Sequence, residues 1–256
     1  MATLVTGASA GLGEHFARAL AARGEALILT ARRRERLDAL ADELRGAHGI
    51  AIDVFPADLA APDAPERLLA DIAAAGLTVD TLINNAGYGA KGNVADLSLE
   101  RQVGQIDLNC RALVALAHGV LPAMIAAKRG RILNLASTAA FQAGPYMAVY
   151  YATKAFVLSF SEALHEEVRG HGIHVTALCP GPTRTEFADV AGMGESKLFA
   201  SVAAAPEQVV RDGLRALDAN RAIEISGAAN AVGAFAERFI PRAWTRKVAA
   251  RFAQDR

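Results

Sequence analysis

Short apolar runs alternate with segments of helical periodicity along the chain, and this alternation limits the fold more than any other feature. Seven runs have the length of strands, and they cover residues 3–6, 26–31, 50–55, 81–84, 131–135, 174–178 and 222–226. Between them apolar residues recur at helical spacing, as at Leu37, Leu40, Ala41 and Leu44. Strands that are apolar on both faces are typical of a parallel sheet covered by helices. The pattern predicts an α/β fold with a seven-stranded, mainly parallel sheet and helices on both faces.

No linker-like segment, low-complexity segment or internal repeat interrupts the 256 residues. We therefore expect one doubly wound, Rossmann-type domain over residues 1–256. Lysine plus arginine and aspartate plus glutamate balance at 27 each. Such a chain has no net field to attract a polyanion, so we expect no nucleic-acid partner.

The two cysteines and the apolar stretches bear on the compartment. Cys110 and Cys179 lie in apolar segments far apart in sequence, which favours buried thiols in a reducing compartment, and we expect a cytoplasmic location. The N-terminus lacks the pattern of a signal peptide. No uncharged apolar stretch reaches about 18 residues, so we expect no membrane-spanning helix.

A glycine-rich turn follows the first strand. Gly7, Gly11 and Gly13 stand between the run at 3–6 and the next helical segment. A turn of this kind lets the backbone approach a pyrophosphate, whose charge then meets the free amides at the helix N-terminus. The spacing differs from the G-x-G-x-x-G pattern, and a tight connection without a ligand is the alternative.

The end of the second strand indicates which dinucleotide is bound. An acidic residue at this place accepts the ribose hydroxyls of NAD, but here Ala31 is followed by Arg32, Arg33 and Arg34. Guanidinium groups suit a 2′-phosphate, so the sequence favours NADP(H) over NAD(H). The alternative is that these arginines solvate the start of the next helix.

A tyrosine and a lysine stand four residues apart in the stretch AVYYATKAF. Tyr150 and Lys154 share one face if this stretch is helical. A cation beside a phenol favours the phenolate and lowers its pKa, so the pair could donate and accept a proton. A purely structural pair on an amphipathic helix is the alternative.

Several motifs together resemble the classical short-chain dehydrogenase/reductase family. They are TGASAGLG at 6–13, NNAG at 84–87, Asn109 in LNC, Ser137 in NLAST, Tyr150 with Lys154, and PGPTRT at 180–185. They occur in the family's order from residue 3 to about residue 185, and Ser137 precedes Tyr150 by the family's separation of 13 residues. Tyr151 has the wrong spacing to both Ser137 and Lys154.

The resemblance implies a role for each matching position. The catalytic residues would be Asn109, Ser137, Tyr150 and Lys154. The cofactor would contact Gly7, Ser9, Gly11, Leu12, Gly13, Arg32, Arg33, Asp58, Asn84, Ala86, Gly87, Tyr150, Lys154, Pro180, Gly181 and Thr185. Tyr150 would be the general acid or base, Ser137 would bond the substrate oxygen, Lys154 would hold the nicotinamide ribose, and Asn109 would support a water. Without these roles, Asn109 would make a local backbone bond in a helix and Ser137 would be a turn residue.

The implied function is an NADP-dependent oxidoreductase that acts on a carbonyl or secondary alcohol, such as a carbonyl reductase. The rival from another class is a catalytically silent dinucleotide sensor or scaffold, which would need the glycine turn but not the proton-transfer residues. A nucleotide-sugar epimerase or dehydratase would need a larger substrate domain. The six histidines form no ligand set, so we expect no metal site. Ser137 lacks a G-x-S-x-G elbow, which argues against a serine hydrolase.

Substrate specificity and partners depend on two less regular segments. Apolar residues follow Ser137 and the PG motif, and we expect a substrate loop at about 186–205 and a fairly hydrophobic substrate. The residues concerned are Phe141, Gln142, Tyr146, Met147, Phe187, Met193, Leu198 and Phe199; they could equally belong to the core. Residues 237–256 form a basic amphipathic segment that packs on the body or on a second subunit, or contacts a membrane surface. The resemblance implies a homodimer or homotetramer.

Overall fold

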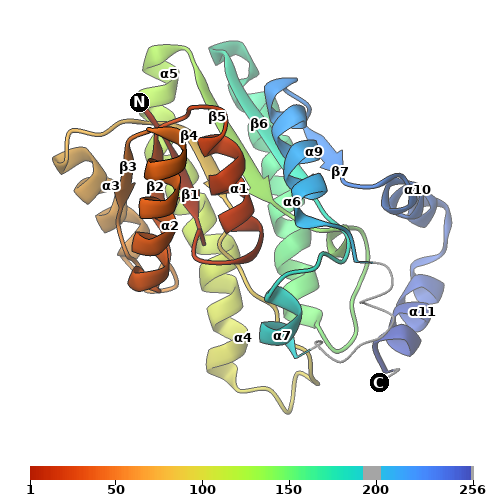
Figure 1. Ribbon diagram of the computed structural model, residues 1–256. Coiled ribbons are helices and arrows are strands. Elements are labelled where there is room, and N and C mark those ends of the chain that lie inside the picture. Colours follow the sequence, from red (N-terminus) through yellow and green to blue (C-terminus); the bar gives the residue numbers. More distant parts are fainter. Residues whose placement is uncertain (193–202, 255–256) are drawn as a thin grey trace.

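The computed structural model describes residues 1–192 and 203–254. Its strands form one seven-stranded sheet in the order β3-β2-β1-β4-β5-β6-β7, and every neighbouring pair is parallel. The strands are β1 (Ala2–Thr6), β2 (Leu27–Thr30), β3 (Ile52–Val54), β4 (Val79–Asn84), β5 (Gly130–Leu135), β6 (Ile173–Cys179) and β7 (Ile223–Ile225). All seven predicted strands are confirmed, with ends that differ by one or two residues. The predicted doubly wound fold with a parallel sheet is confirmed as well (Figure 1).

One face of the sheet is covered by α1 (Gly11–Ala21), α2 (Arg34–His48) and α9 (Pro206–Asp218). The apolar positions that the helical spacing predicted in α2, from Leu37 to Leu44, are buried there. Phe16 and Leu20 of α1 lie in the same core, with no exposed surface. The strands β1 and β2 contribute the facing residues, including Val5 and Leu29.

The opposite face is covered by α3 (Ala64–Ala74), α5 (Leu113–Ala127) and α6 (Ala148–Val168). Leu116, Val120 and Met124 of α5 pack there against Leu82 and Ile132 of the sheet. Helix α4 (Leu99–Ile106) and the π-helical turn η1 (Asp107–Ala112) lead directly into α5. Both cysteines are free thiols and buried, as the sequence predicted.

The continuous helical run Leu99–Ala127 has the length and mean hydropathy, 1.7, of a membrane span. Its second half is α5, whose buried side chains form part of the core under the sheet. Its first half carries charged residues, among them Asp107 and Arg111, which pair with each other. Within the described residues one side of α5 packs against the sheet, and 39% of the apolar window is buried.

The chain leaves the sheet at β7 and ends beside it. Helix α10 (Ala228–Ala236), the turn η4 (Glu237–Phe239) and α11 (Arg242–Gln254) lie at the β7 side of the molecule (Figure 1). Trp244 and Val248 on α11 are exposed. The expected helix in the C-terminal segment is confirmed, whereas the side chain of Phe252 lies outside the described part of the chain.

Three shorter elements lie in the connections between the strands and the longer helices. They are the 3-10 turns η2 (Thr138–Phe141) and η3 (Arg169–His171) and the short helix α7 (Phe187–Ala191). The first and last of these lie in the loops that follow β5 and β6, at the carboxyl ends of the strands.

Candidate active site and cofactor cleft

A cleft of about 460 Å³ lies across the carboxyl ends of the strands. Its lining comes from the segments that follow β1, β2, β3, β4, β5 and β6. Because the strand order reverses between β1 and β4, this is the switch point where open α/β sheets bind ligands. Most of the predicted cofactor residues line it: Gly7, Ser9, Gly11, Leu12, Arg32, Arg33, Asp58, Ala86, Gly87, Tyr150, Lys154, Pro180, Gly181 and Thr185.

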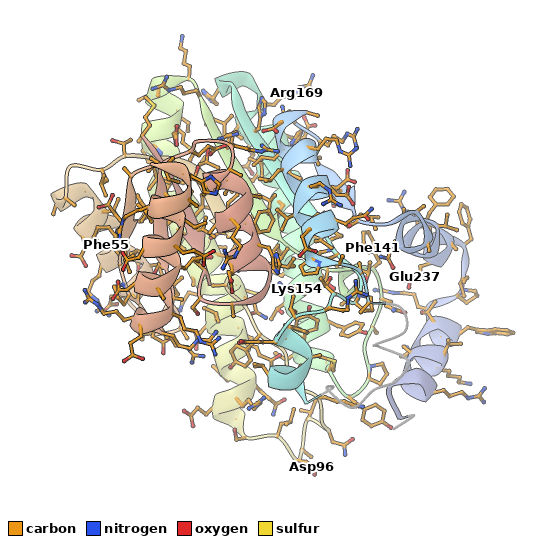
Figure 2. The ribbon with its side chains drawn as sticks, viewed as in Figure 1. Phe55, Asp96, Phe141, Lys154, Arg169 and Glu237 are labelled. Carbon is orange, nitrogen blue, oxygen red and sulfur yellow. The ribbon has the colours of Figure 1, made fainter. Side chains whose placement is uncertain are left out.

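Tyr150 and Lys154 lie in the first two turns of α6 and line this cleft together. The Lys154 Nζ atom is 5.8 Å from the centre of the Tyr150 ring. It donates a hydrogen bond of 2.6 Å to the carbonyl oxygen of Leu135, at the end of β5. Both side chains are buried, and Lys154 is labelled in Figure 2. The helical spacing therefore places the phenol and the ammonium in one buried site, as predicted.

The pKa of Tyr150 differs from the expectation. Burial raises the pKa of the phenol above its ordinary value, a hydrogen bond with the Ser137 side chain opposes this rise, and Tyr151 adds to it. The predicted net lowering by Lys154 is wrong, because desolvation dominates and the ammonium donates to the Leu135 carbonyl. The phenol is therefore protonated at neutral pH.

The pKa of Lys154 is lowered to about 8, mainly because burial disfavours the ammonium form. The buried thiols of Cys110 and Cys179 act in the opposite direction. Only the Leu135 carbonyl among the described groups accepts a hydrogen bond from Nζ. A charged Lys154 therefore lowers the stability of the fold.

Replacing Lys154 by methionine is expected to give a stability advantage at pH 7 that shrinks as the pH rises to 10. The lysine loses its proton near pH 8 when folded but near its ordinary pKa of 10.5 when unfolded. Between these values the unfolded chain binds more protons, so the wild-type protein gains stability relative to the variant. Urea unfolding of both proteins at pH 7, 8.5 and 10 measures the difference, which should change by on the order of 1–2 kcal/mol. A difference between the wild-type protein and Lys154→Met that stays constant with pH would contradict the prediction.

Asn109 lies in the π-helical turn η1 and is buried outside the cleft lining. Its Oδ1 accepts a hydrogen bond from the Tyr88 amide at 3.1 Å, and its Nδ2 donates to the Tyr88 carbonyl at 2.9 Å. Nδ2 also lies 3.1 Å from the hydroxyl of Thr153, which donates to the Tyr150 carbonyl. The alternative of a local backbone bond is therefore wrong. Asn109 ties the loop after β4 to the turn of α6 that carries the tyrosine and lysine, and π-helical turns often occur at functional sites.

Ser137 follows β5 and lines the cleft. Its hydroxyl accepts a hydrogen bond of 3.1 Å from the Ala139 amide and lies 3.4 Å from the Pro180 carbonyl. It thus caps the turn η2, as the turn-residue alternative supposed, and also faces the site. The two interpretations are compatible, because a cap holds the hydroxyl in a fixed position beside Tyr150.

The glycines after β1 divide into two roles. Gly7 and Gly11 line the cleft with φ of +66° and +56°, a conformation that favours glycine. Gly13 does not line the cleft. It packs against the glycine turn, where a Cβ atom would lie 2.2 Å from the Gly7 carbonyl oxygen. The absence of a side chain at Gly13 therefore lets α1 approach the glycine turn closely. The predicted contact of Gly13 with a pyrophosphate stays a prediction.

Two of the three arginines after β2 line the cleft. Arg33 donates to the Ser9 hydroxyl and to the Ser9 carbonyl, both at 3.2 Å, which fixes its guanidinium above the glycine turn. Arg32 lines the same end of the cleft. Arg34 instead pairs with Asp38 on α2, so the alternative of a solvated helix start describes this residue alone. A glycine turn with guanidinium groups beside it fits a phosphorylated dinucleotide.

The two asparagines after β4 also divide. Asn84 is buried, lies outside the cleft lining and donates to Asn134 Oδ1 at 3.0 Å, which links β4 to β5. Its predicted contact with the cofactor stays a prediction. Asn85 lines the cleft, and its Nδ2 donates to the Thr6 carbonyl at 2.8 Å. The sequence analysis missed Asn85, although its place as the second asparagine of NNAG, just past the strand, indicates it.

Apolar side chains form the wall of the cleft next to Tyr150. Met147, Tyr151, Phe187 and Val190 line it, and the Phe187 ring centre is 5.3 Å from that of Tyr150. The Tyr151 ring is 6.0 Å away at an interplanar angle of 77°. Tyr151 was set aside by spacing, but the structure places it in the cleft wall.

The predicted specificity residues are only partly in this wall. Gln142, Met147 and Phe187 line the cleft. Phe141 does not and packs against the core around α6 and β6 instead, so the alternative of a core role is correct for it (Figure 2). Tyr146 lies outside the lining as well. Met193, Leu198 and Phe199 lie outside the described residues.

Fold and cleft together define a doubly wound oxidoreductase of the dinucleotide-binding class. The model of the short chain dehydrogenase family matches residues 1–195. The chain belongs to this family, and it is an oxidoreductase of that family.

Curated relatives and solved structures agree with this assignment. An uncharacterized oxidoreductase of Myxococcus xanthus is 40% identical over 186 residues, which are 72% of each chain. The NADP-dependent 3-hydroxy acid dehydrogenase YdfG of Salmonella typhi is 39% identical over 201 residues, 77% of this chain and 79% of the relative. A short-chain dehydrogenase from Sphingobium yanoikuyae, solved in complex with NADPH, has a TM-score of 0.82 and 33% identity over 93% of this chain and 94% of that chain.

Proposed function

We propose that this oxidoreductase transfers a hydride between NADP(H) and a carbonyl or secondary alcohol carbon, with Tyr150 as general acid or base. One observation carries the proposal: Tyr150, Ser137 and Lys154 line the same cleft as the glycine turn and Arg33. A dinucleotide sensor would need only the second half of that cleft. The presence of both halves favours catalysis over the sensor alternative.

Each residue has a chemical task. Bound nicotinamide would supply or accept the hydride. Tyr150 donates a proton to the substrate oxygen during reduction, and Ser137 donates a hydrogen bond to the same oxygen as charge develops there. Lys154 holds the ribose hydroxyls beside the phenol, and Asn109 positions α6 through Tyr88 and Thr153. Burial raises the pKa of the Tyr150 phenol, so at neutral pH the hydroxyl carries the proton that reduction requires.

NADP(H) is the proposed cofactor because Arg33 and Arg32 stand where an NAD site would carry a carboxylate. The relative named as NADP-dependent and the solved structure with NADPH support this preference. Arg33→Gln is expected to weaken NADP+ binding about tenfold while leaving NAD+ binding nearly unchanged, because one charge-assisted contact to the 2′-phosphate is lost. Titration calorimetry with both cofactors measures the ratio of the NADP+ affinity to the NAD+ affinity.

The adjacent Arg34→Gln variant is the matched control, since Arg34 pairs with Asp38 and does not line the cleft. It removes the same charge and should leave the ratio close to the wild-type value. Equal weakening by the two substitutions would mean that general charge, rather than contact, determines the preference.

The substrate is proposed to be fairly hydrophobic and uncharged near its carbonyl group. Met147, Phe187 and Val190 form the wall beside Tyr150. Among the described lining residues the cations are Arg32, Arg33 and Lys154, and all three are assigned to the cofactor or to proton transfer. The described wall therefore offers no further cation for the carboxylate of a substrate such as a hydroxy acid.

Several expectations about organisation stay predictions. They are the single domain over residues 1–256, the substrate loop at about 186–205, the homodimer or homotetramer and the cytoplasmic location. Peripheral membrane contact through residues 237–256 also stays a prediction, and the exposed Trp244 and Val248 are compatible with either a lipid surface or a second subunit.

A further inference from the structure

An ion-pair cluster joins Arg33 of the cleft and Arg36 of α2 to the loop that follows β6. The Glu186 carboxylate accepts from Arg33 at 3.2 Å through Oε2 and from Arg36 at 2.7 Å through Oε1. The three side chains are about half exposed, and all bonds are direct. Glu186 and the two arginines are 150 or more residues apart in sequence, so the cluster connects the start of α2 to the loop after β6.

The two guanidinium groups of the cluster form an anion-binding site, and the Glu186 carboxylate is the anion bound there. Each carboxylate oxygen takes one guanidinium, and Arg33 is further fixed by Ser9 on the glycine turn. Hydrogen bonding to Arg36 and to Arg33 lowers the pKa of Glu186, so the group is ionised at neutral pH. A 2′-phosphate has more oxygens and close to two negative charges, and it makes the stronger charge-assisted bonds with the same guanidinium groups.

We propose that the Glu186 carboxylate and the 2′-phosphate of NADP(H) compete for the Arg33 guanidinium, so that the phosphate replaces the carboxylate when the cofactor binds. This inference rests on the proposed cofactor site. Glu186 is then a determinant of cofactor affinity: it competes with the phosphorylated dinucleotide and not with NAD(H), which has no phosphate at that position. The negative charge of Glu186 also repels the 2′-phosphate. Competition and repulsion both lower the affinity for NADP(H).

The exchange connects the cofactor to the substrate end of the cleft. Glu186 directly precedes α7, whose residues Phe187 and Val190 line the cleft beside Tyr150. While Glu186 is paired with Arg33 and Arg36, the start of α7 is tethered to the β2 side of the site. Displacement of the carboxylate from Arg33 removes this ion pair at the start of α7, and only the phosphorylated cofactor causes it.

The test is the binding of NADP+ and NAD+ to Glu186→Gln, measured by titration calorimetry. Glutamine keeps the size of the side chain and removes its charge, so NADP+ should bind about fivefold more tightly while NAD+ binding stays unchanged. The gain should shrink in about 1 M salt, because exposed charges are then screened. In an Arg33→Gln background the same substitution should give a much smaller gain, as a double-mutant cycle requires for coupled residues.

Glu166→Gln is the matched control. Glu166 also pairs with an arginine, Arg169, but at the far end of α6 from Tyr150. It removes one exposed carboxylate without altering the cleft and should change neither affinity. Circular dichroism melting of each variant establishes that it is folded.

The outcomes separate the inference from the function on which it rests. Unchanged or weaker NADP+ binding by folded Glu186→Gln, with normal binding by the wild-type protein, would overturn the inference and leave the proposed function intact. Equal tightening of NADP+ and NAD+ would also overturn it, since exchange requires the 2′-phosphate. Absence of NADP+ binding by the wild-type protein would refute the cofactor assignment and the inference together.

Discussion

Tyr150→Phe is expected to lower kcat about a thousandfold while the affinity for NADP+ changes little. The substitution removes only the hydroxyl, which is the proton donor in the proposed reaction, and proton transfer by a positioned group contributes about 10²–10⁴-fold. The ring remains and keeps its packing against Phe187 and Met147. Steady-state reduction of a carbonyl substrate measures kcat, and calorimetry measures cofactor binding.

Tyr151→Phe is the matched control for this prediction. Tyr151 neighbours Tyr150, lines the same cleft and has a pKa that burial also raises. Tyr151 is three residues from Lys154, whereas Tyr150 is four residues away. Removal of the Tyr151 hydroxyl should therefore leave most of the activity. Activity that survives Tyr150→Phe but not Tyr151→Phe would show that the proton donor is misassigned.

Gly13→Ala is expected to destabilise the fold by about 3 kcal/mol and to impair cofactor binding. A Cβ atom at Gly13 would lie 2.2 Å from the Gly7 carbonyl oxygen and 2.5 Å from Asn85 Nδ2. The first of these atoms belongs to the backbone of the glycine turn, so relief requires α1 or the turn to move, and overpacking of this kind costs about 1–3 kcal/mol or more. Alanine's better helix propensity offsets only about 1 kcal/mol of that cost.

Gly46→Ala gives the comparison that isolates the steric effect. Gly46 lies inside α2 without a positive φ, and a Cβ atom there meets no atom within 4 Å. The same chemical change should therefore stabilise the protein by about 0.5–1 kcal/mol. Urea unfolding of the two variants measures both signs, and destabilisation by Gly46→Ala or neutrality of Gly13→Ala would contradict the packing argument.

The fold was predictable because its determinants are local and repeated. Each strand of the parallel sheet carries an apolar run, and each covering helix carries its own periodicity, so Leu37 and Leu44 could be placed in the core from spacing alone. The glycine turn and the Tyr150 and Lys154 pair were predictable for the same reason. Their geometry depends on a strand end and on one helical turn, and both are short-range features.

What the sequence did not reveal depends on contacts between distant segments. Asn84 and Asn85 are adjacent, yet the alternation of side chains along a strand end sends the first into the sheet and the second to the cleft. The pKa of Tyr150 depends on the enclosure made by Phe187 and Met147. The pairing of Glu186 with Arg33 spans 153 residues, and no periodicity encodes it.

The central claim is that Tyr150 and the NADP(H) site act together on a carbonyl group. The most direct test compares NADPH oxidation by the wild-type protein and by Tyr150→Phe. The loss of NADPH absorbance is measured with a panel of uncharged ketones and aldehydes that carry apolar groups of increasing size. We predict loss of absorbance with the wild-type protein for at least the more apolar members, slower loss with NADH, and almost none with Tyr150→Phe. Turnover that is undiminished in Tyr150→Phe, or faster with NADH than with NADPH, would contradict the account.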